Sequence, residues 1–180
     1  MAAIITEQKK FDMGLFSFLK NAGAALAGAA AKREANKPVR NIPSTDTDTA
    51  MERLENAQMA MRITNQIASL GLKVNDLSVE VDDDAAKVFG TVESQGDREK
   101  VILAVGNVYG IATVDDRLSV VNPEPEAVFY TVKKGDSLSK IAKAHYGSYR
   151  SYMKIFEANR PMLTDPDKIY PGQVLRIPPA

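Results

Sequence analysis

Residues 129–178 have the sequence FYTVKKGDSLSKIAKAHYGSYRSYMKIFEANRPMLTDPDKIYPGQVLRIP, in which two strand-like ends enclose two helical segments. The first end, residues 130–132, is aromatic and β-branched, as strands usually are. A Gly-Asp-Ser turn follows, and its Ser137 can cap a helix that begins at Leu138. A Tyr-Pro-Gly turn later leads into the closing strand, residues 174–177. The stretch therefore predicts a compact βααβ unit.

The two helices of this unit are expected to be separated by Gly147, which is a typical helix stop. The second helix is expected over residues 149–159, because Pro161 then prevents its continuation. Its apolar face is predicted from three-and-four spacing, which is met by Tyr149, Tyr152, Met153 and Phe156. His145, the single histidine of the chain, lies near the end of the first helix, where we expect packing or a dipole interaction rather than catalysis.

Three motifs in this unit, YTVKKGDSLSKIA, IFEANR and DKIYPGQVLRIP, occur in the order typical of a LysM module, which the unit resembles. The resemblance implies binding of N-acetylglucosamine-containing glycans in a shallow groove between two loops. One loop comprises Gly135, Asp136, Ser137 and Leu138, and the other comprises Asp167, Lys168, Ile169 and Tyr170. Gly135 exposes backbone groups, and Tyr170 offers an apolar ring with a polar tip. The alternative is structural: Asp136 and Ser137 cap a helix, and Ile169 fills the small core.

Length and composition limit the remaining possibilities. The chain has 180 residues, which is enough for two small domains. Its 23 basic and 23 acidic side chains give a formal net charge of +0, so no global field favours nucleic acid. Without cysteine the chain lacks thiolate nucleophiles and disulfides, and we expect its single histidine to pack rather than to act as the usual general base. We therefore expect a binding protein, not an enzyme.

The segment before the LysM-like unit alternates helix and strand patterns. A capping box at residues 49–52 predicts a long helix with an apolar stripe, and Gly71 ends it. That stripe consists of Ala60, Ile63, Ile67 and Leu70. Apolar and polar residues then alternate over residues 77–82, and Val88 and Val92 belong to a second strand in which Gly90 allows close approach of a neighbour.

A further helix is expected to begin at Ser94-Gln95-Gly96-Asp97, and residues 111–120 alternate as a third strand. The predicted order is αββαβ. This order and the sequence VFGTVESQGDREKVILAVGNVYGIATVDDRLSVV resemble a BON domain. The fold class is thus α+β, with a BON-like domain at residues 46–121, a linker at residues 122–127 and a LysM-like domain at residues 128–180.

Residues 1–45 are expected to form an extension, a short helix and a linker, with residues 1–12 as a dispensable appendage. The helix is expected through residues 22–31, with Phe16, Leu19 and Leu26 on one face. Lys20 and other polar residues interrupt the apolar run, which is too short to span a bilayer and is a poor match to a signal peptide. A myristoylation motif also fails at Phe18.

Two groups of acids could suggest a divalent-cation site, namely residues 82–84 and residues 115–116. Their spacing does not match a calcium-binding loop, and we expect exposed acids in turns instead.

A BON-like domain followed directly by a LysM-like unit, after a leader that begins MGLFSFLKNAG, is similar to the small bacterial potassium-binding proteins of the BON-LysM family. The resemblance implies a cytoplasmic monomer that binds K⁺ selectively, compacts on binding it and serves potassium sensing or osmotic adaptation. It also implies that backbone carbonyl groups hold the ion. The matching positions here are Leu19, Ala22, Gly106, Val108 and Ile111.

The residues themselves leave two interpretations of the 105–111 turn open. Terminal helix carbonyls lack internal partners and can replace water around K⁺, and Gly106 and Gly110 permit the necessary backbone path. The same residues could form only a helix stop that leads into a strand. A rival function is peptidoglycan binding outside the cytoplasm through the LysM-like unit, and a third is a lipid-associated BON protein of the envelope.

Overall fold

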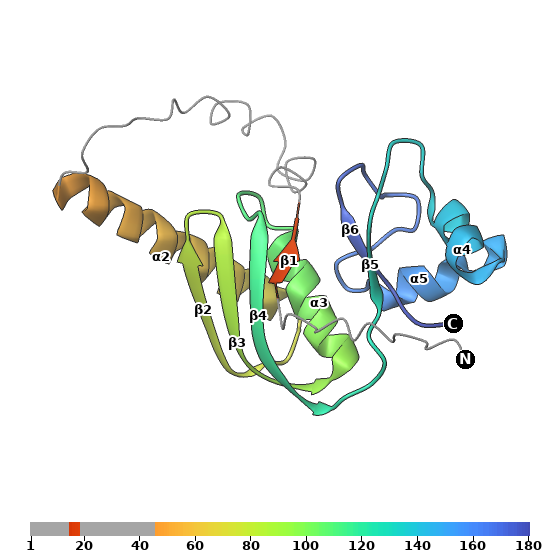
Figure 1. The fold of residues 1–180 in the computed structure, drawn as a ribbon, viewed down its shortest axis with the longest axis horizontal. Helices are drawn as coiled ribbons and strands as arrows, with labels where there is room; N and C mark the ends of the chain where they lie inside the picture. The colour runs from red at the N-terminus through yellow and green to blue at the C-terminus, as the bar shows by residue number, and fades with distance from the viewer. Residues whose placement is uncertain (1–14, 19–45) are drawn as a thin grey trace, which may run out of the picture.

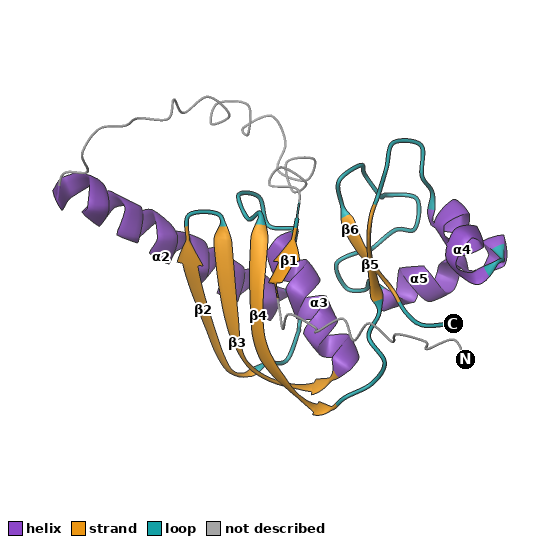
Figure 2. Ribbon diagram, viewed as in Figure 1, coloured by secondary structure: helices purple, strands orange, loops and turns teal. Residues whose placement is uncertain are grey.

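A computed structural model of the chain describes residues 15–18 and 46–180. Two units lie side by side in it (Figures 1 and 2). The first contains β1 (Leu15–Ser17), α2 (Asp46–Ser69), β2 (Asn75–Asp82), β3 (Ala85–Ser94), α3 (Gln95–Gly106) and β4 (Thr113–Asn122). The second contains β5 (Val128–Thr131), α4 (Leu138–Tyr146), the 3₁₀ turn η2 (Tyr149–Ser151), α5 (Tyr152–Ala158) and β6 (Val174–Ile177). The mixed α+β class and the order αββαβ followed by βααβ are confirmed.

The first unit is built on a four-stranded sheet in the order β1-β4-β3-β2. β2 and β3 form an antiparallel hairpin, whereas β3 and β4 run parallel because α3 carries the chain back between them. β1 pairs antiparallel with β4, with Leu15 opposite Asp115 and Ser17 opposite Thr113. The prediction that Phe16 belongs to a helical face is wrong, since the free edge of β4 binds this segment as a strand. Leu19 and Leu26 of that prediction lie outside the described residues.

The start of α2 differs from the prediction, whereas its end agrees with it. The helix begins at Asp46, so the predicted capping box at residues 49–52 lies inside it. No Pro or Gly stands between Pro43 and Thr49, and the helix can therefore extend backwards past the expected start. At the other end Gly71 has the predicted left-handed conformation, with φ 68°, and Leu72 N–H donates to Ile67 O at 3.2 Å.

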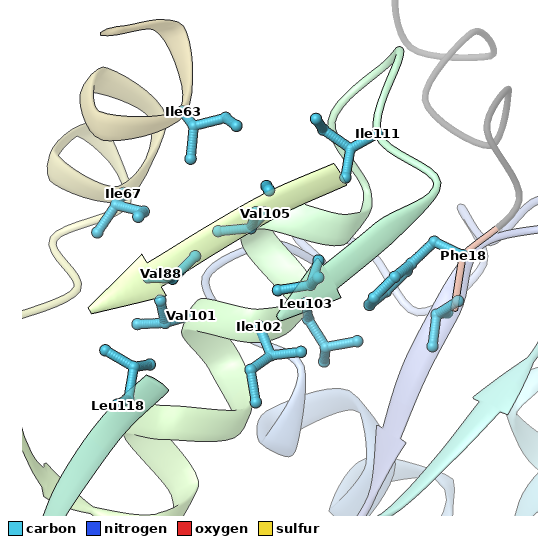
Figure 3. Close-up of a cluster of buried hydrophobic side chains, with 13 residues drawn as sticks. Phe18, Ile63, Ile67, Val88, Val101, Ile102, Leu103, Val105, Ile111 and Leu118 are labelled. Atoms are coloured by element: carbon cyan, nitrogen blue, oxygen red, sulfur yellow. The ribbon is translucent and has the colours of Figure 1, made fainter. Parts of the chain in front are cut away.

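The core of the first unit lies between one face of the sheet and the two helices, as Figure 3 shows for ten labelled side chains. Ile63 and Ile67 of the predicted stripe are fully buried, while Ala60 and Leu70 lie at its margin. From α3, Val101, Ile102, Leu103 and Val105 fill the same core. Gly90 lies where the segment before β2 passes close to β3, because a Cβ on Gly90 would be 2.5 Å from Val74 Cγ1.

The second unit has its own core between the β5–β6 hairpin and its helices. Ser137 caps α4 as predicted, and Gly147 ends it with φ 73°. The predicted apolar face of the second helix is wrong at two positions: Tyr149 is 59% exposed and Met153 is 43% exposed, while Ile155 is fully buried. The reason is that residues 149–151 form a 3₁₀ turn, whose tighter winding shifts the face on which later residues lie.

The two units touch along α3 and β6. Val174 of β6 joins the core of the first unit, and the rings of Phe16 and Phe129 meet edge to face with centroids 5.0 Å apart. The linker itself is held by Ala127 N–H, which donates to Glu99 Oε1 at 2.8 Å. No helix in the described part of the chain is long and apolar enough to cross a membrane.

Candidate functional site

The turn that follows α3 concentrates backbone oxygen atoms at a helix carboxyl terminus. Asn107 N–H donates to Leu103 O and Val108 N–H donates to Val105 O, both at 3.0 Å, which closes the helix. Gly110, with φ 100°, then redirects the chain towards β4. A helix carboxyl end carries partial negative charge, so the remaining carbonyl oxygens of this turn are suited to a cation.

Three of the predicted ligand positions lie in this turn. Within the described residues, no donor reaches the carbonyl oxygens of Gly106 and Ile111, whereas Val108 O accepts the N–H of Ile111 at 3.2 Å. The side chain of Ile111 is fully buried in the core of the first unit, and Val108 packs against the same core. Neither side chain has a polar atom, so the backbone carbonyl groups are what Val108 and Ile111 can offer to a cation.

The leader reaches this turn through Phe18. Phe18 N–H donates to Ala112 O at 2.7 Å, and its ring packs on the last turn of α3 (Figure 3). A Cβ on Gly106 would lie only 2.2 Å from Phe18 Cζ, so the ring requires glycine at this position. The other two predicted ligands, Leu19 and Ala22, lie outside the described residues.

Sequence reasoning missed Asn107, the residue between Gly106 and Val108. Its amide makes two hydrogen bonds with the second unit: Nδ2 donates to Val174 O, and Val174 N–H donates to Oδ1, both at 3.2 Å. Nδ2 also donates to Leu103 O at 3.0 Å. An asparagine after a predicted helix suggests a cap, but nothing in the local sequence indicates Val174 as its partner.

Sequence reasoning also missed a buried ion pair between the two units. Glu99, which is 2% exposed, accepts a hydrogen bond from Arg176 Nε of β6. Gln95 Nε2 and Ala127 N–H donate to the other carboxylate oxygen at 3.0 and 2.8 Å. The carboxylate therefore joins α3, the linker and β6, and its charge is well compensated.

The acidic residues do not form the divalent-cation site that was considered. The described residues contain no group of three or more potential ligands that could hold a metal ion. The expectation of exposed turn acids is wrong for Asp115 and Asp116, because both lie on β4. Asp116 is 4% exposed and accepts from Arg98 Nε at 2.6 Å and from Leu118 N–H at 2.9 Å.

In the first of the two LysM-type loops, most side chains have structural partners. Asp136 accepts hydrogen bonds from Lys133 N–H and Tyr130 Oη, both at 2.8 Å. The Lys133 N–H, followed by the Tyr130 hydroxyl, holds the pKa of Asp136 below its ordinary value, and the same hydroxyl bond raises the pKa of Tyr130. Ser137 caps α4 through Lys140 N–H at 3.3 Å, and Leu138 is buried in the core. Gly135 has open space over its Cα.

The second loop is also tied to its surroundings. Asp167 N–H donates to Asp165 Oδ1 at 2.9 Å, and Lys168 Nζ lies 3.4 Å from Asp165 Oδ2. Ile169 packs against the core of the second unit. Burial raises the pKa of Tyr170, whose N–H donates to Gln173 Oε1 at 3.2 Å. His145, in the last turn of α4, makes a ring contact with Tyr130 at 5.6 Å.

Comparison with known proteins identifies both units. The BON domain family matches residues 55–122, and the LysM domain family matches residues 130–178. The potassium binding protein Kbp of Escherichia coli is 42% identical over 167 residues, which cover 92% of this chain and 99% of that protein. A protein of Deinococcus radiodurans is 57% identical over 49 residues, which cover 27% of this chain and 19% of that protein.

Proposed function

Since this chain belongs to the BON-LysM family of the potassium binding protein Kbp, we propose that it binds potassium ions. The observation that supports the proposal is the turn after α3, in which the carbonyl oxygens of Gly106 and Ile111 accept no hydrogen bond from the described residues. Potassium is large and weakly hydrated, and several carbonyl oxygens can replace its water. A small divalent ion would favour carboxylates instead.

The proposed ligands are the backbone carbonyls of Gly106, Val108 and Ile111 together with those of Leu19 and Ala22. Support for leader participation comes from Phe18, which lies against Gly106 and immediately precedes Leu19. A leader that supplies ligands would be held against the turn by the ion, and the protein would become more compact. We propose a cytoplasmic monomer that senses or buffers potassium during osmotic stress, without catalysis.

The test is a comparison of the protein in KCl and in NaCl at equal ionic strength. A ligand that binds only the folded state adds RT ln(1 + [L]/Kd) to its stability, about 2.7 kcal/mol at a hundredfold excess over Kd. We expect K⁺, and not Na⁺, to raise the thermal midpoint and to reduce the radius of gyration in solution scattering. Equal midpoints and unchanged scattering profiles in the two salts would contradict the proposal.

A second candidate function is binding of N-acetylglucosamine-containing glycan by the LysM unit. It is supported by the family match over residues 130–178 and by the open space over Gly135. The proposed groove would use backbone groups and the exposed parts of Gly135–Ser137 and Asp167–Tyr170, since Leu138 faces the core. Retention on insoluble peptidoglycan, together with a periplasmic location in cell fractions, would favour this function over potassium sensing.

A further inference from the structure

One edge of β6 is hydrogen-bonded to two asparagine side chains rather than to another strand. β5 pairs with β6 along the other edge. Asn159 Nδ2 donates to Arg176 O, and Arg176 N–H donates to Asn159 Oδ1, both at 2.8 Å. Asn107 makes the same pair of bonds with Val174, both at 3.2 Å. Residues two apart in a strand present their backbone groups to the same side, so the two amides line one edge.

The two asparagines occupy equivalent positions in different units. Each is the C-cap of its helix, Asn107 for α3 and Asn159 for α5. Each also donates Nδ2 to the carbonyl four residues earlier, Leu103 O at 3.0 Å and Ile155 O at 2.7 Å. Asn159 thereby connects α5 to β6 within the LysM unit. Asn107 connects α3 of the BON unit to the same strand.

Asn107 lies between Gly106 and Val108, whose backbone carbonyl groups are two of the proposed potassium ligands. A peptide turn whose central side chain is fixed at two points has less freedom to rotate its carbonyls. We propose that Asn107 is a positioning residue through which docking of the LysM unit holds this turn in its potassium-binding shape. The inference rests on the proposed function of the turn. Because linkage is reciprocal, potassium would in turn strengthen docking of the LysM unit on α3.

The ion pair between Glu99 and Arg176 provides an independent means of loosening the docked arrangement. It lies on α3 and β6 but outside the 106–111 turn. Replacing both partners, as in Glu99→Gln with Arg176→Met, avoids leaving a buried charge alone. The glutamine introduced in this variant retains an oxygen that can accept Ala127 N–H. Weakened docking can thus be compared with a change in the turn itself.

The experiment measures potassium affinity by calorimetry for the full chain and for Asn107→Ala. We expect Kd to rise about tenfold, within the roughly 5–150-fold range of typical coupling between sites. Ser94→Ala is the matched control, because it removes a cap from the opposite end of the same helix. That control should lower the thermal midpoint by a similar amount while leaving Kd within about twofold, because it also removes a helix cap but does not touch the turn. Circular dichroism at the titration temperature confirms that each variant is folded.

A double-mutant cycle separates coupling from a local effect of the cap. If Asn107 acts through docking, Asn107→Ala should weaken binding far less in the Glu99→Gln, Arg176→Met background than in the wild type. An equal effect in both backgrounds, or an unchanged Kd for Asn107→Ala, would overturn the inference while the proposed function stands. Failure of the wild-type protein to bind K⁺ would overturn both.

Discussion

Gly106 lies directly against the ring of Phe18, the leader residue that packs on α3. Its Cα faces the ring of Phe18 so closely that three ring carbons lie 2.2–2.3 Å from the position of a Cβ. Gly96, near the other end of the same helix, has a different neighbour, since its Cβ would lie 3.3 Å from Arg176 Nη2. The two glycines therefore form a natural pair for mutation.

Gly106→Ala is expected to destabilise the protein by about 1–3 kcal/mol, because overpacking the ring outweighs the helix preference for alanine. That preference favours alanine by only about 0.5–1 kcal/mol. Gly96→Ala, the control, should have a smaller effect, because the nearest atom would lie 3.3 Å rather than 2.2 Å from the added Cβ. Urea unfolding measures both variants, and a Gly106→Ala protein as stable as the wild type would show that Phe18 does not pack as described.

Asp136 should give the LysM unit a defined response to acid. Its folded-state pKa lies below the ordinary value of 3.8, chiefly because Lys133 N–H donates to the carboxylate. The ionised group therefore stabilises the fold at higher pH, and this contribution is lost as the pH falls through the lowered pKa. We expect wild-type stability to fall more steeply below about pH 4 than that of Asp136→Asn. Parallel pH profiles for the two proteins would be incompatible with this role.

At the residue scale, what could be predicted depended on the distance to the partner in sequence. Ser94 and Ser137 were correctly identified at helix starts because the N–H groups that donate to their hydroxyl oxygens lie three residues away. The partner of Asn107 lies 67 residues away, and no local pattern encodes it. The ligand positions Gly106, Val108 and Ile111 came from family resemblance, because no local pattern distinguishes a potassium ligand from an ordinary helix stop, and the structure brings them into one turn.

At the element scale, β1 shows why a short strand escapes sequence analysis. Three residues have too few alternations to reveal a period, and their conformation depends on the edge of β4. The anchor of this strand is Phe18, which is 9% exposed, whereas Leu15 at its start is 67% exposed. The 3₁₀ turn at residues 149–151 escaped prediction for a related reason, since it changes the helical period within one segment.

Phe18→Ala should release β1 from β4, at a local cost on the order of 3 kcal/mol. Hydrogen exchange of the amides of residues 15–18 should then become roughly a hundredfold faster, since each 1.4 kcal/mol is tenfold. Leu15→Ala, at the exposed end of the same strand, should change exchange little. Similar exchange in the two variants would mean that Phe18 is not the anchor.

At the scale of the whole molecule, α3 is the element that both units share. One of its faces fills the core of the BON unit, while Glu99 and Asn107 bind β6 of the LysM unit. The order of elements could be predicted from the sequence because each helix and strand has its own periodic signal. The interface could not, because its polar pairs and its apolar contacts, such as Val174 in the core of the BON unit, join residues that lie far apart in the sequence. We propose that the LysM unit also supports the turn after α3, whether or not it binds glycan.

We propose that the turn after α3 makes this chain a selective potassium-binding protein. Calorimetric titration of the full chain with KCl, compared with NaCl, RbCl and MgCl₂, tests it most directly. We expect saturable binding of K⁺, weaker or no binding of Na⁺ and Mg²⁺, and a loss of affinity in Gly106→Ala. Absence of saturable K⁺ binding, or equal binding of K⁺ and Na⁺, would contradict it.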